Sequence, residues 1–597
     1  MGWPYRFGEL TAEQKQQRRE LLDWYGFVAQ MSVLVPLLAL QVYFLTVWVG
    51  KKIQRQKDLG APSSPYAKAH RSTTTARIAK NVRLLARRIQ WWLGNSLELL
   101  GYHLGTNGEV IAAVTWTAWL LLLLSCFQTG DDYLHLTKRF GIVGASQLPF
   151  HYLLALKWSY SPLQLLTHCS HETLISLHQL LGRSITLLFY LHVAFYLNFY
   201  ILSNLLAQKI TEWYIICGII ATVAFTAVGT TALAPLKRWN YRAFFITHVS
   251  LATLILPLLY FHVRHIRIYI YETAAIYAVH AVLRFFSTKT LPASIRILSD
   301  TNLVEIDIPT PLSEKGFLRP RWKPGHHAYV SLAGHPFLRT FRSNPFTVAS
   351  IPREDGRIRF VARILDGNTA KLARCAKDAG VSQKVTLEGP YGVTTHADRL
   401  LQYDRVLLVA GGIGATFVVP IYRQVLADLS PSKGSFRHQK VNFVWVARTK
   451  ADVTWALPEI ETQRQGFIER LKVFITSSTS RDLGTTTDGS LVIAGEEDEE
   501  SAMAGETEEG IELEQRKNLL AGEDVGAAVK VEGGITFLAG RPNLGKLIEQ
   551  TFSQGDSERV AVLVCGPRRL SQALRTEVGE YVESGRDVWF WEESFAL

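Results

Sequence analysis

Long apolar stretches fill the first half of the chain, and shorter alternating runs follow in the second half. About seven stretches predict membrane-spanning helices. They lie near residues 25–49, 110–128, 141–157, 178–202, 213–234, 243–262 and 269–286. A helix of about 20 apolar residues crosses the hydrocarbon core of a bilayer, and the first, second and fourth stretches reach that length. The third contains Pro149 and gives a weaker pattern.

The pattern changes near residue 290. Short β-rich runs separated by turn residues predict a small antiparallel barrel, at 294–297, 303–308, 327–332 and 358–364. After about residue 400, strands alternate with helical stretches, which predicts a doubly wound α/β domain. We therefore expect four parts: a span, basic loop and second span in 1–130, a helical membrane bundle in 131–288, a β-barrel in 289–398 and an α/β domain in 399–597.

An acidic segment interrupts the last domain. Residues 480–530 contain the run Glu496 to Glu500, with further glutamates among glycine, serine and threonine, and lack aromatic residues. Such a composition buries too little apolar surface to fold, so we expect a solvated, disordered insertion.

Two histidine pairs with equal spacing lie in the apolar stretches. His178 and His192 are fourteen residues apart, as are His248 and His262. Fourteen residues make about four helical turns and rise about 21 Å, so both members of a pair face one side of a helix. Two such helices side by side present four imidazoles in two layers, which suits two bis-histidine haems stacked across a membrane.

The alternative for each single histidine is a hydrogen-bonded packing residue. The repeat of the spacing favours ligation, because ionisable residues inside a membrane are costly and are usually functional. His151 and His265 lack a matched partner, and we interpret them as ordinary residues.

Basic residues predict the orientation of the helices. The loop between the first two spans carries many lysines and arginines from Lys51 to Arg88, against few acidic residues such as Asp58 and Glu98, so it should be cytosolic. Seven crossings then place the N-terminus outside and the second half of the chain in the cytosol. The first histidine of each pair would lie toward the cytosol and the second toward the outside. Residues 79–100 also suggest an amphipathic helix at the membrane surface.

The composition agrees with a protein that is partly in a membrane. Hydrophobic residues make up 48% and charged residues 19% of the chain. The net charge of +12 gathers beside the apolar stretches, which indicates topology and lipid headgroups rather than nucleic acid. The five cysteines include no CxxC, so neither a disulfide framework nor a zinc site is indicated. The polar residues 10–20 do not form a signal peptide.

Two glycine turns follow predicted strands in the last domain. Residues 406–416 read as strand, glycine turn and helix, with Gly411, Gly412, Gly414 and Thr416 at the turn. Glycines let a backbone approach a pyrophosphate, and a helix N-terminus offers N–H groups to phosphates. The alternative is a tight strand–helix connection. The second turn is Cys565-Gly566-Pro567.

The order of these motifs resembles the ferredoxin–NADP reductase superfamily. With the histidine pairs, the chain resembles the ferric reductase and NADPH oxidase superfamily, and in particular the fungal ferric-chelate reductases. Residues 322–327 and 342–350 resemble the PGQH and HPFT flavin segments of that superfamily, with Asn344 in place of its histidine. Residues 388–392 match the turn that closes the family's barrel, and 591–597 resemble the EESF ending of the fungal reductases.

The resemblance implies cofactors for each part: two b haems in the bundle, FAD on the barrel and NADPH on the α/β domain. The implied haem ligands are His178, His192, His248 and His262, and the implied FAD contacts are Pro345, Phe346 and Thr347. The implied NADPH contacts are Gly411, Gly412, Gly414, Thr416, Arg448, Cys565, Gly566 and Pro567. Phe595 would cover the flavin ring and yield to the nicotinamide, or would serve only in packing.

Arg448 suits the adenosine 2′-phosphate because a guanidinium makes bidentate bonds to a dianion. The strand that precedes it does not end in an acidic residue, which also favours NADPH over NADH.

The implied function is electron transfer from cytosolic NADPH through FAD and two haems to an external Fe(III) chelate or Cu(II). It would support reductive iron uptake at the plasma membrane, coupled to an iron permease or oxidase. An NADPH oxidase that makes superoxide shares this architecture, although the equal spacing and the EESF end favour the reductases. A membrane paralogue without flavin or enzymatic activity is the third alternative, and Asn344 is the residue that supports it.

Overall fold

The computed structural model describes most of the chain. The described residues are 5–8, 10–59, 74–99, 102–125, 131–157, 161–309, 322–332, 343–365, 367–376, 382–392, 395–430, 440–458, 461–477, 530–532, 535–555 and 558–593. The predicted disordered insertion therefore lies almost wholly outside the described residues, and so does Phe595.

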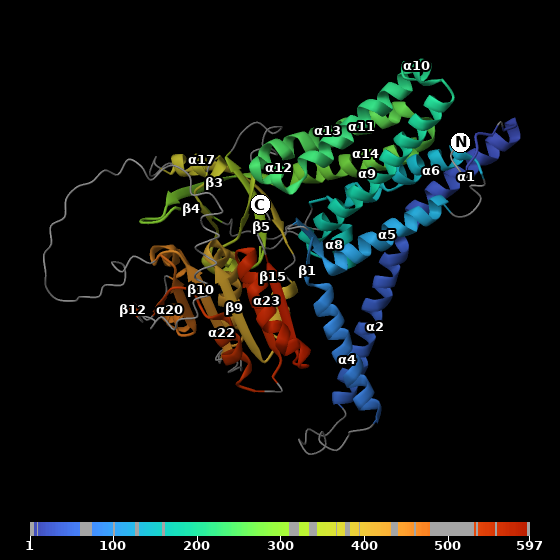
Figure 1. The fold of residues 1–597 in the computed structure, drawn as a ribbon. Coiled ribbons are helices and arrows are strands. Elements are labelled where there is room, and N and C mark those ends of the chain that lie inside the picture. Colours follow the sequence, from blue (N-terminus) through green and yellow to red (C-terminus); the bar gives the residue numbers. More distant parts are fainter. Residues whose placement is uncertain are drawn as a thin grey trace, which may run out of the picture.

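Apolar helices form the first half, as the hydropathy pattern predicts (Figure 1). Within the described residues, six helical segments are long and apolar enough to cross a membrane: Ala12–Gly50, Asn107–Leu124, His171–Leu202, Trp213–Thr231, Tyr241–His262 and Arg264–Ser287. Their elements are α1 (Ala12–Met31), α2 (Leu34–Leu59), α5 (Asn107–Ser125), α9 (His171–Leu202), α11 (Trp213–Thr231), α13 (Tyr241–His262), η1 (Arg264–Ile266) and α14 (Arg267–Ser287).

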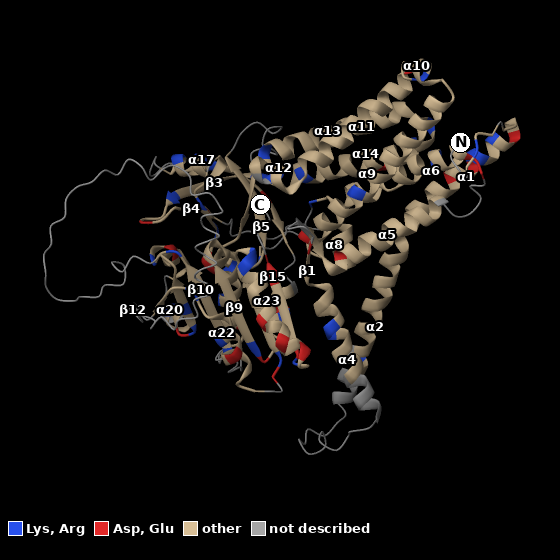
Figure 2. Cartoon of the chain, viewed as in Figure 1, with Lys and Arg blue, Asp and Glu red and all other residues tan. Residues whose placement is uncertain are grey.

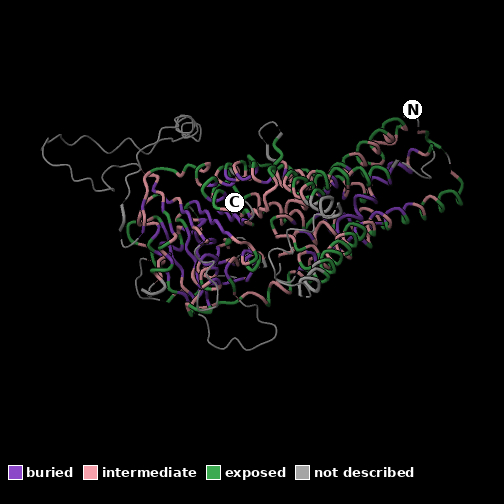
Figure 3. The backbone as a smooth tube through the Cα atoms, turned by 90° about the horizontal axis from the view of Figure 1, so that it is seen from below, coloured by how far each residue is buried: buried purple, intermediate pink, exposed green. Residues whose placement is uncertain are grey.

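The surface of these helices is apolar, as contact with lipid requires. Leu38, Val223 and Val279 are each more than half exposed. Figure 2 shows that most of the bundle is uncharged, with charged residues mainly near the ends of the helices. Figure 3 shows the buried residues concentrated in the sheets, whereas the bundle is mostly half-buried or exposed. Because lipid tails are themselves apolar, this outer surface needs no protein cover.

The third expected span, residues 141–157, is not one long helix. The chain instead forms α6 (Tyr133–Ser146) and α7 (Leu148–Leu154), with Pro149 in the first turn of α7. Proline is tolerated in a first helical turn but not in a helix interior, which accounts for the break. α6 is the more deeply buried helix, and its Arg139 stacks over Tyr25 at 3.7 Å and donates to the carbonyl of Leu123 at 3.0 Å.

Short polar caps begin several of these helices. The Asp132 side chain accepts hydrogen bonds from the backbone N–H groups of Leu134 and His135 at the start of α6, and Ser170 accepts from Thr173 at the start of α9. These caps satisfy N–H groups that have no partner within the helix. Shorter helices complete the bundle: α8 (Pro162–Thr167), α10 (Leu206–Lys209) and α12 (Ala234–Trp239).

A six-stranded antiparallel sheet follows α14, in the order β6-β5-β8-β3-β4-β7. Its strands are β3 (Thr288–Ile297), β4 (Leu303–Pro309), β5 (His327–Leu332), β6 (Asn344–Thr347), β7 (Arg357–Arg363) and β8 (Gln383–Tyr391). A bridge between Val348 and Phe360 joins the two outer strands, so the sheet is nearly closed. Short helices α16 (Pro352–Asp355) and α17 (Asn368–Cys375) lie between strands.

The last domain is a seven-stranded sheet in the order β12-β13-β11-β10-β9-β14-β15, parallel except for the edge strand β12. The strands are β9 (Arg405–Gly411), β10 (Val441–Ala447), β11 (Leu471–Ile475), β12 (Lys530–Glu532), β13 (Ile535–Ala539), β14 (Val560–Cys565) and β15 (Val588–Glu593). Its helices are α18 (Thr395–Leu400), η2 (Gly412–Gly414), α19 (Ala415–Asp428), η5 (Ala451–Ala456), α20 (Glu461–Ile468), α22 (Leu544–Phe552) and α23 (Arg568–Glu583).

The order in which the chain adds strands to this sheet reverses between β9 and β14, although both strands run parallel. From β9 the chain builds outward through β10 and β11, and it then returns to place β14 on the other side of β9. Apolar clusters cover both faces of the sheet. The predicted sequence of a helical membrane bundle, an antiparallel barrel and a doubly wound α/β domain is thus confirmed, while the exact domain boundaries stay predictions.

The basic loop forms a helix that packs on the last domain. α4 (Thr74–Leu93) precedes a hairpin of β1 (Ser96–Leu99) and β2 (Tyr102–Thr106). Its Trp91 meets Phe590 of β15 edge to face at 5.7 Å, and the Arg575 guanidinium lies 4.2 Å above the Trp91 ring. The amphipathic helix predicted over 79–100 ends earlier, at Leu93, because the β1–β2 hairpin begins at Ser96. Its Trp91 contacts the α/β domain, and its position at the membrane surface stays a prediction.

Candidate functional site

The four histidines face one another as two pairs between α9 and α13. The ring centroids of His178 and His248 are 6.2 Å apart, and those of His192 and His262 are 6.4 Å apart. A metal–imidazole bond is about 2 Å long and the ring centroid lies roughly 1 Å farther back, so two rings on one metal ion lie about 6 Å apart. The spacing therefore fits one iron between each pair.

Backbone carbonyls orient three of the four rings. Nδ1 of His178 lies 3.0 Å from the carbonyl oxygen of His151, Nδ1 of His192 lies 2.8 Å from that of Thr137, and Nδ1 of His262 lies 2.7 Å from that of Tyr214. A carbonyl can only accept, so each Nδ1 carries the proton and donates. Nε2 of these rings is then left with a free lone pair, which is the form that binds a metal.

Two glycines make room for the two histidines of the second layer, His192 and His262. A Cβ atom at Gly141 of α6 would lie 2.8 Å from Cε1 of His192, and one at Gly218 of α11 would lie 2.6 Å from Cε1 of His262. Any side chain at either position would push the ring aside. The neighbouring helices α6 and α11 therefore leave space for these rings by having glycine at the contact.

His151 is closely associated with the first pair, which corrects its interpretation as an ordinary residue without a partner. Its ring stacks on that of His178, with centroids 3.9 Å apart and an angle of 10°. Gly182 leaves the space, since a Cβ atom there would lie 2.9 Å from Cε1 of His151. The sequence signal was present, because His151 and Thr137 are also fourteen residues apart.

The contacts of Thr137 and His151 show that α6 and α7 together pass both histidine layers. Thr137 reaches His192 at one layer and His151 reaches His178 at the other. The broken third helix therefore runs beside the part of α9 that carries the histidines. Among the described residues, no group of three or more histidine, cysteine, aspartate or glutamate side chains could hold a metal ion. Two histidines suffice for a haem, because the porphyrin supplies the other four ligands.

The two glycine turns of the α/β domain lie against each other, at the carboxyl ends of β9 and β14. A Cβ atom at Gly414 would lie 2.3 Å from the carbonyl oxygen of Cys565, and one at Gly411 would lie 2.7 Å from Pro567. Strand order reverses at this point, which is where open α/β sheets bind their ligands. Both the tight connection and the cofactor interpretation of the turn thus find a structural counterpart.

Different glycines serve the tight strand–helix connection and the possible contact with a phosphate. Gly411 and Gly414 are required by the contact with the second turn, whereas Gly412 has a φ of +54° with open space where a Cβ atom would lie. Trp445 of β10 donates from Nε1 to the Gly412 carbonyl at 3.2 Å, which holds the turn from below. Gly412 is therefore the position at which a phosphate could approach the backbone closely.

The other predicted NADPH contacts differ in access. Thr416 is buried and donates its hydroxyl to the carbonyl of Ile413 at 2.9 Å, so the hydroxyl is already used within the turn. Arg448 follows β10 and is exposed. The exposed guanidinium is open to a ligand, and its role stays a prediction.

Cys565 and Glu593 end the adjacent strands β14 and β15 and pair in register. Burial raises the pKa of the Cys565 thiol well above its ordinary value, so this cysteine is neutral. Burial, with the charge of Glu172 from the start of α9, raises the pKa of Glu593 from 4.5 to about 8. A protonated carboxyl therefore lies between the nucleotide domain and the bundle.

The predicted flavin segment forms the edge strand β6. It pairs with β5 so that Thr347 lies opposite His327 and Pro345 opposite Tyr329. Thr347 is buried, Phe346 is half-buried and packs on the barrel core, and Pro345 is exposed. The Asn344 side chain accepts from the amide of Asn368 at 3.4 Å, so the residue that replaces the family histidine has a partner.

A polar cluster joins the bundle to the barrel, and sequence reasoning missed it. Arg284 near the end of α14 donates to Glu388 of β8 through Nε at 2.6 Å and Nη2 at 2.9 Å, and Tyr391 also donates to Glu388 at 2.8 Å. Lys157, just after α7, donates to the Tyr329 hydroxyl at 2.6 Å. The available signal was a charged residue at the end of each of two apolar stretches, but it does not name a partner.

Three family models match successive parts of the chain. The ferric reductase like transmembrane component matches residues 140–259, an FAD-binding domain matches 287–395 and the ferric reductase NAD binding domain matches 403–579. Their order is that of the bundle, the barrel and the α/β sheet.

Fungal relatives match over most of the chain. A probable metalloreductase AIM14 of Meyerozyma guilliermondii is 23% identical over 462 residues, which cover 76% of this chain and 84% of the relative. Ferric reductase transmembrane component 3 of Saccharomyces cerevisiae is 23% identical over 470 residues, covering 77% and 61%. Ferric/cupric reductase transmembrane component 2 of Schizosaccharomyces pombe is 22% identical over 504 residues, covering 76% and 79%.

The matches to the bundle, barrel and nucleotide domain together confirm the resemblance to the ferric reductase family that the histidine pairs and the glycine turns indicated.

Proposed function

We propose that this protein is a transmembrane ferric-chelate reductase that takes electrons from NADPH in the cytosol and reduces an Fe(III) chelate, or Cu(II), on the other side of the membrane. The observation that carries the proposal is the pair of facing histidine layers, with ring centroids 6.2 Å and 6.4 Å apart. The names of the fungal relatives, which include ferric and ferric/cupric reductases, support it.

FAD on the barrel and haem between the histidine layers would supply the conversion from a two-electron donor, NADPH, to single-electron transfer. One NADPH thus reduces two Fe(III) to two Fe(II) and leaves NADP⁺ and a proton. The residues of the chain bind, orient and insulate these groups. We assign no acid or base residue to the reaction.

We assign the inner haem to His178 and His248 and the outer haem to His192 and His262. The backbone carbonyls of His151, Thr137 and Tyr214 keep three of these rings in the metal-binding tautomer. These hydrogen bonds would hold the rings in place around a bound haem.

We assign FAD to β6 through Pro345, Phe346 and Thr347. NADPH would lie across the turns at Gly412 and Gly566, with Arg448 toward the 2′-phosphate and Phe595 over the flavin ring. The closest support is the open backbone of Gly412 at the carboxyl end of β9.

Orientation and location follow from the basic loop and form part of the proposal. The lysines and arginines between Lys51 and Arg88 favour a cytosolic loop, and α4 from that loop contacts the α/β domain through Trp91 and Arg575. The basic loop and the α/β domain would therefore lie on the same side of the membrane. The plasma membrane, a role in reductive iron uptake and coupling to a permease or oxidase complete the proposal.

The test uses full-length protein in nanodiscs with haem, FAD and NADPH, and follows haem absorbance together with Fe(II) trapped by ferrozine. His192→Ala should lose one haem signal and ferric reduction, whereas His168→Ala, in the same bundle but outside both pairs, should retain both. Normal haem content and ferric reduction in His192→Ala would refute the ligand assignment. Superoxide as the main wild-type product would favour an NADPH oxidase, and absence of flavin binding would favour the non-enzymatic paralogue.

A further inference from the structure

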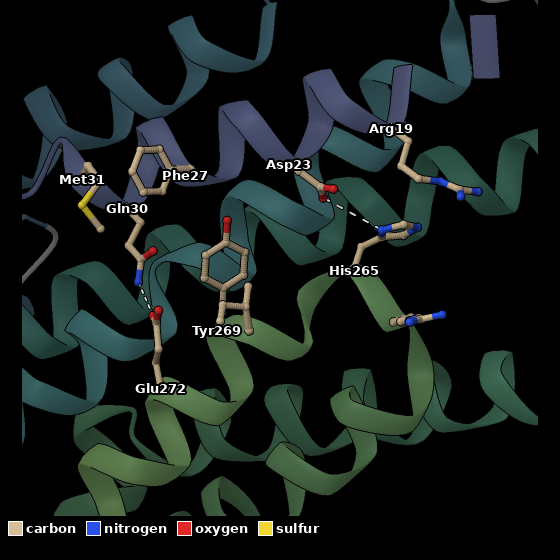
Figure 4. A pocket seen from close by; sticks show the side chains of 10 residues that line it. Arg19, Asp23, Phe27, Gln30, Met31, His265, Tyr269 and Glu272 are labelled. Carbon is tan, nitrogen blue, oxygen red and sulfur yellow. Dashed lines mark hydrogen bonds and ion pairs between the residues drawn. The ribbon is translucent and has the colours of Figure 1, made fainter. Parts of the chain in front are cut away.

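A polar groove lies between α1 and the start of α14 (Figure 4). Its volume is about 760 Å³, within the range of about 300–1,000 Å³ that holds small ligands. Side chains of α1, η1 and α14 line it: Arg19, Asp23, Phe27, Gln30, Arg264, His265, Tyr269 and Glu272 among them.

The groove lies at the end of the bundle away from the barrel. Arg264 and His265 follow His262 by two and three residues, and α14 then runs for 21 residues before β3 begins. A helix of that length spans about 30 Å, so the groove and the flavin-bearing half lie at opposite ends of α14. The next cofactor site along the chain from this groove is therefore the layer of His192 and His262.

Basic side chains dominate one end of the groove. Arg19, Arg264 and His265 gather there, and His265 Nδ1 lies 3.9 Å from Asp23 Oδ1. Neither Arg19 nor Arg264 forms a hydrogen bond or ion pair with any residue that the structure describes. Two guanidinium groups without such a bond bind carboxylate oxygens well, because each can make paired, charge-assisted hydrogen bonds.

The other end of the groove is polar but already satisfied. Gln30 donates to Glu272, and Figure 4 shows this bond at one end, the Asp23–His265 pair at the other and Tyr269 between them. α1 approaches Tyr269 closely because Gly26 has no side chain, and a Cβ atom there would lie 2.5 Å from the Tyr269 hydroxyl. The two arginines without a bonded partner therefore lie only at the end of the groove that holds the Asp23–His265 pair.

We propose that this groove is the binding site for the electron acceptor, and that it selects small anionic Fe(III) chelates with carboxylate ligands. The inference rests on the proposed function and names its substrate class. Arg19 and Arg264 bind the carboxylates of the chelate, and the Asp23–His265 pair lines the same end. The metal remains bound by its own chelator, in agreement with the lack of a three-ligand cluster among the described residues.

The kinetic test compares two ferric chelates on full-length protein in nanodiscs: anionic Fe(III)–citrate and neutral Fe(III)–maltol. In Arg19→Gln/Arg264→Gln we expect KM for Fe(III)–citrate to rise about tenfold, with kcat and both constants for Fe(III)–maltol unchanged. Lys15→Gln removes one positive charge a turn away on α1, outside the groove, and should change neither KM. An unchanged KM for citrate, or equal losses for both chelates, would overturn the inference.

A binding measurement separates this inference from the proposed function. Ga(III)–citrate has the charge of the ferric chelate but cannot be reduced, so equilibrium dialysis reports on the groove alone. The wild type should bind it, and the double variant should bind about tenfold more weakly. If the wild type reduces neither ferric chelate, the proposed function fails. If spin-labelled phosphatidic acid binds in place of Ga(III)–citrate and is lost in the double variant, the groove is a lipid site and the inference is wrong.

Discussion

At the scale of single residues, the histidine layers depend on their neighbours as much as on the histidines. Carbonyl oxygens of His151, Thr137 and Tyr214 accept hydrogen bonds from the Nδ1–H groups of three rings, and Gly141 and Gly218 leave space for the rings of His192 and His262. Substituting a residue that supports a metal ligand typically lowers metal affinity about 10- to 100-fold. Substitutions beside the rings therefore probe the site without removing a ligand.

Gly218→Ala should remove the outer haem and leave the inner one. The new methyl group would lie 2.6 Å from Cε1 of His262 and displace the ring, so haem content should fall by roughly half. Gly229→Ala on the same helix is the matched control, since nothing lies within 4 Å of its Cβ position. The measurement is haem per protein by the pyridine haemochrome spectrum. Full haem content in Gly218→Ala would contradict the packing argument.

The free energy of unfolding should decrease as the pH rises, because Glu593 loses its proton less readily in the folded protein. Its pKa is raised from 4.5 to about 8 by burial and by the charge of Glu172. Between these values the folded protein holds a proton that the unfolded chain has released, so the free energy of unfolding decreases with increasing pH. Glu593→Gln should flatten this decline. Thermal unfolding of both proteins at pH 6 and pH 9 measures it, and an equal decline in the variant would refute the prediction.

At the scale of elements, α4 has one apolar face, and its sequence pattern does not indicate that this face packs on the α/β domain. Trp91 packs on Phe590, and Arg575 of α23 stacks on Trp91 and donates to its carbonyl at 2.9 Å. Arg87 pairs with Asp587 at 2.7 Å beside this contact. The basic loop thus provides a strut between α5 and the nucleotide domain, because α4 contacts both α5 and α23.

Trp91→Ala should loosen α23 and β15 while the barrel stays unchanged. Removing the ring exposes apolar surface of Phe590 and leaves Arg575 without its stacking partner. Hydrogen exchange should become faster in α23 and β15. Trp92→Ala is the control, because the Trp92 side chain is 53% exposed. Equal exchange rates in Trp91→Ala and wild type would show that the strut contributes nothing to local stability.

At the scale of the whole molecule, one ion pair connects the membrane bundle to the flavin barrel. Arg284 of α14 makes two hydrogen bonds to Glu388, whose side chain is 6% exposed and is also bound by Tyr391. Removing the arginine would leave a carboxylate buried without its charge partner, which costs about 3–5 kcal/mol. The junction between the two halves is therefore sensitive to this single residue.

Arg284→Met should slow the reduction of the inner haem by NADPH and lower thermal stability. The control is Arg296→Met, whose guanidinium is 59% exposed and whose partner Glu305 keeps Arg359 at 3.3 Å. Stopped-flow absorbance of the haem after addition of NADPH measures the transfer. A wild-type rate in Arg284→Met would show that the ion pair does not hold the two halves in register.

Local pattern determined much of this protein. Apolar runs of sufficient length predict crossing helices, alternating runs predict a barrel, and equal fourteen-residue spacing places two histidines on one face of each helix. Each of these follows from the geometry of one element. Pro149 weakened the pattern of the third stretch, but hydropathy did not show that the stretch divides into two helices, α6 and α7.

Only the tertiary structure decided which faces meet. It placed His151 on His178, set Gly414 against Cys565, and brought Arg284 to Glu388. It also joined α1 and α14 into the groove that holds Arg19 and Arg264. The pattern along a sequence indicates the period of each helix and strand. Contacts between distant elements depend on how all the elements pack together, and the period of one element does not determine that packing.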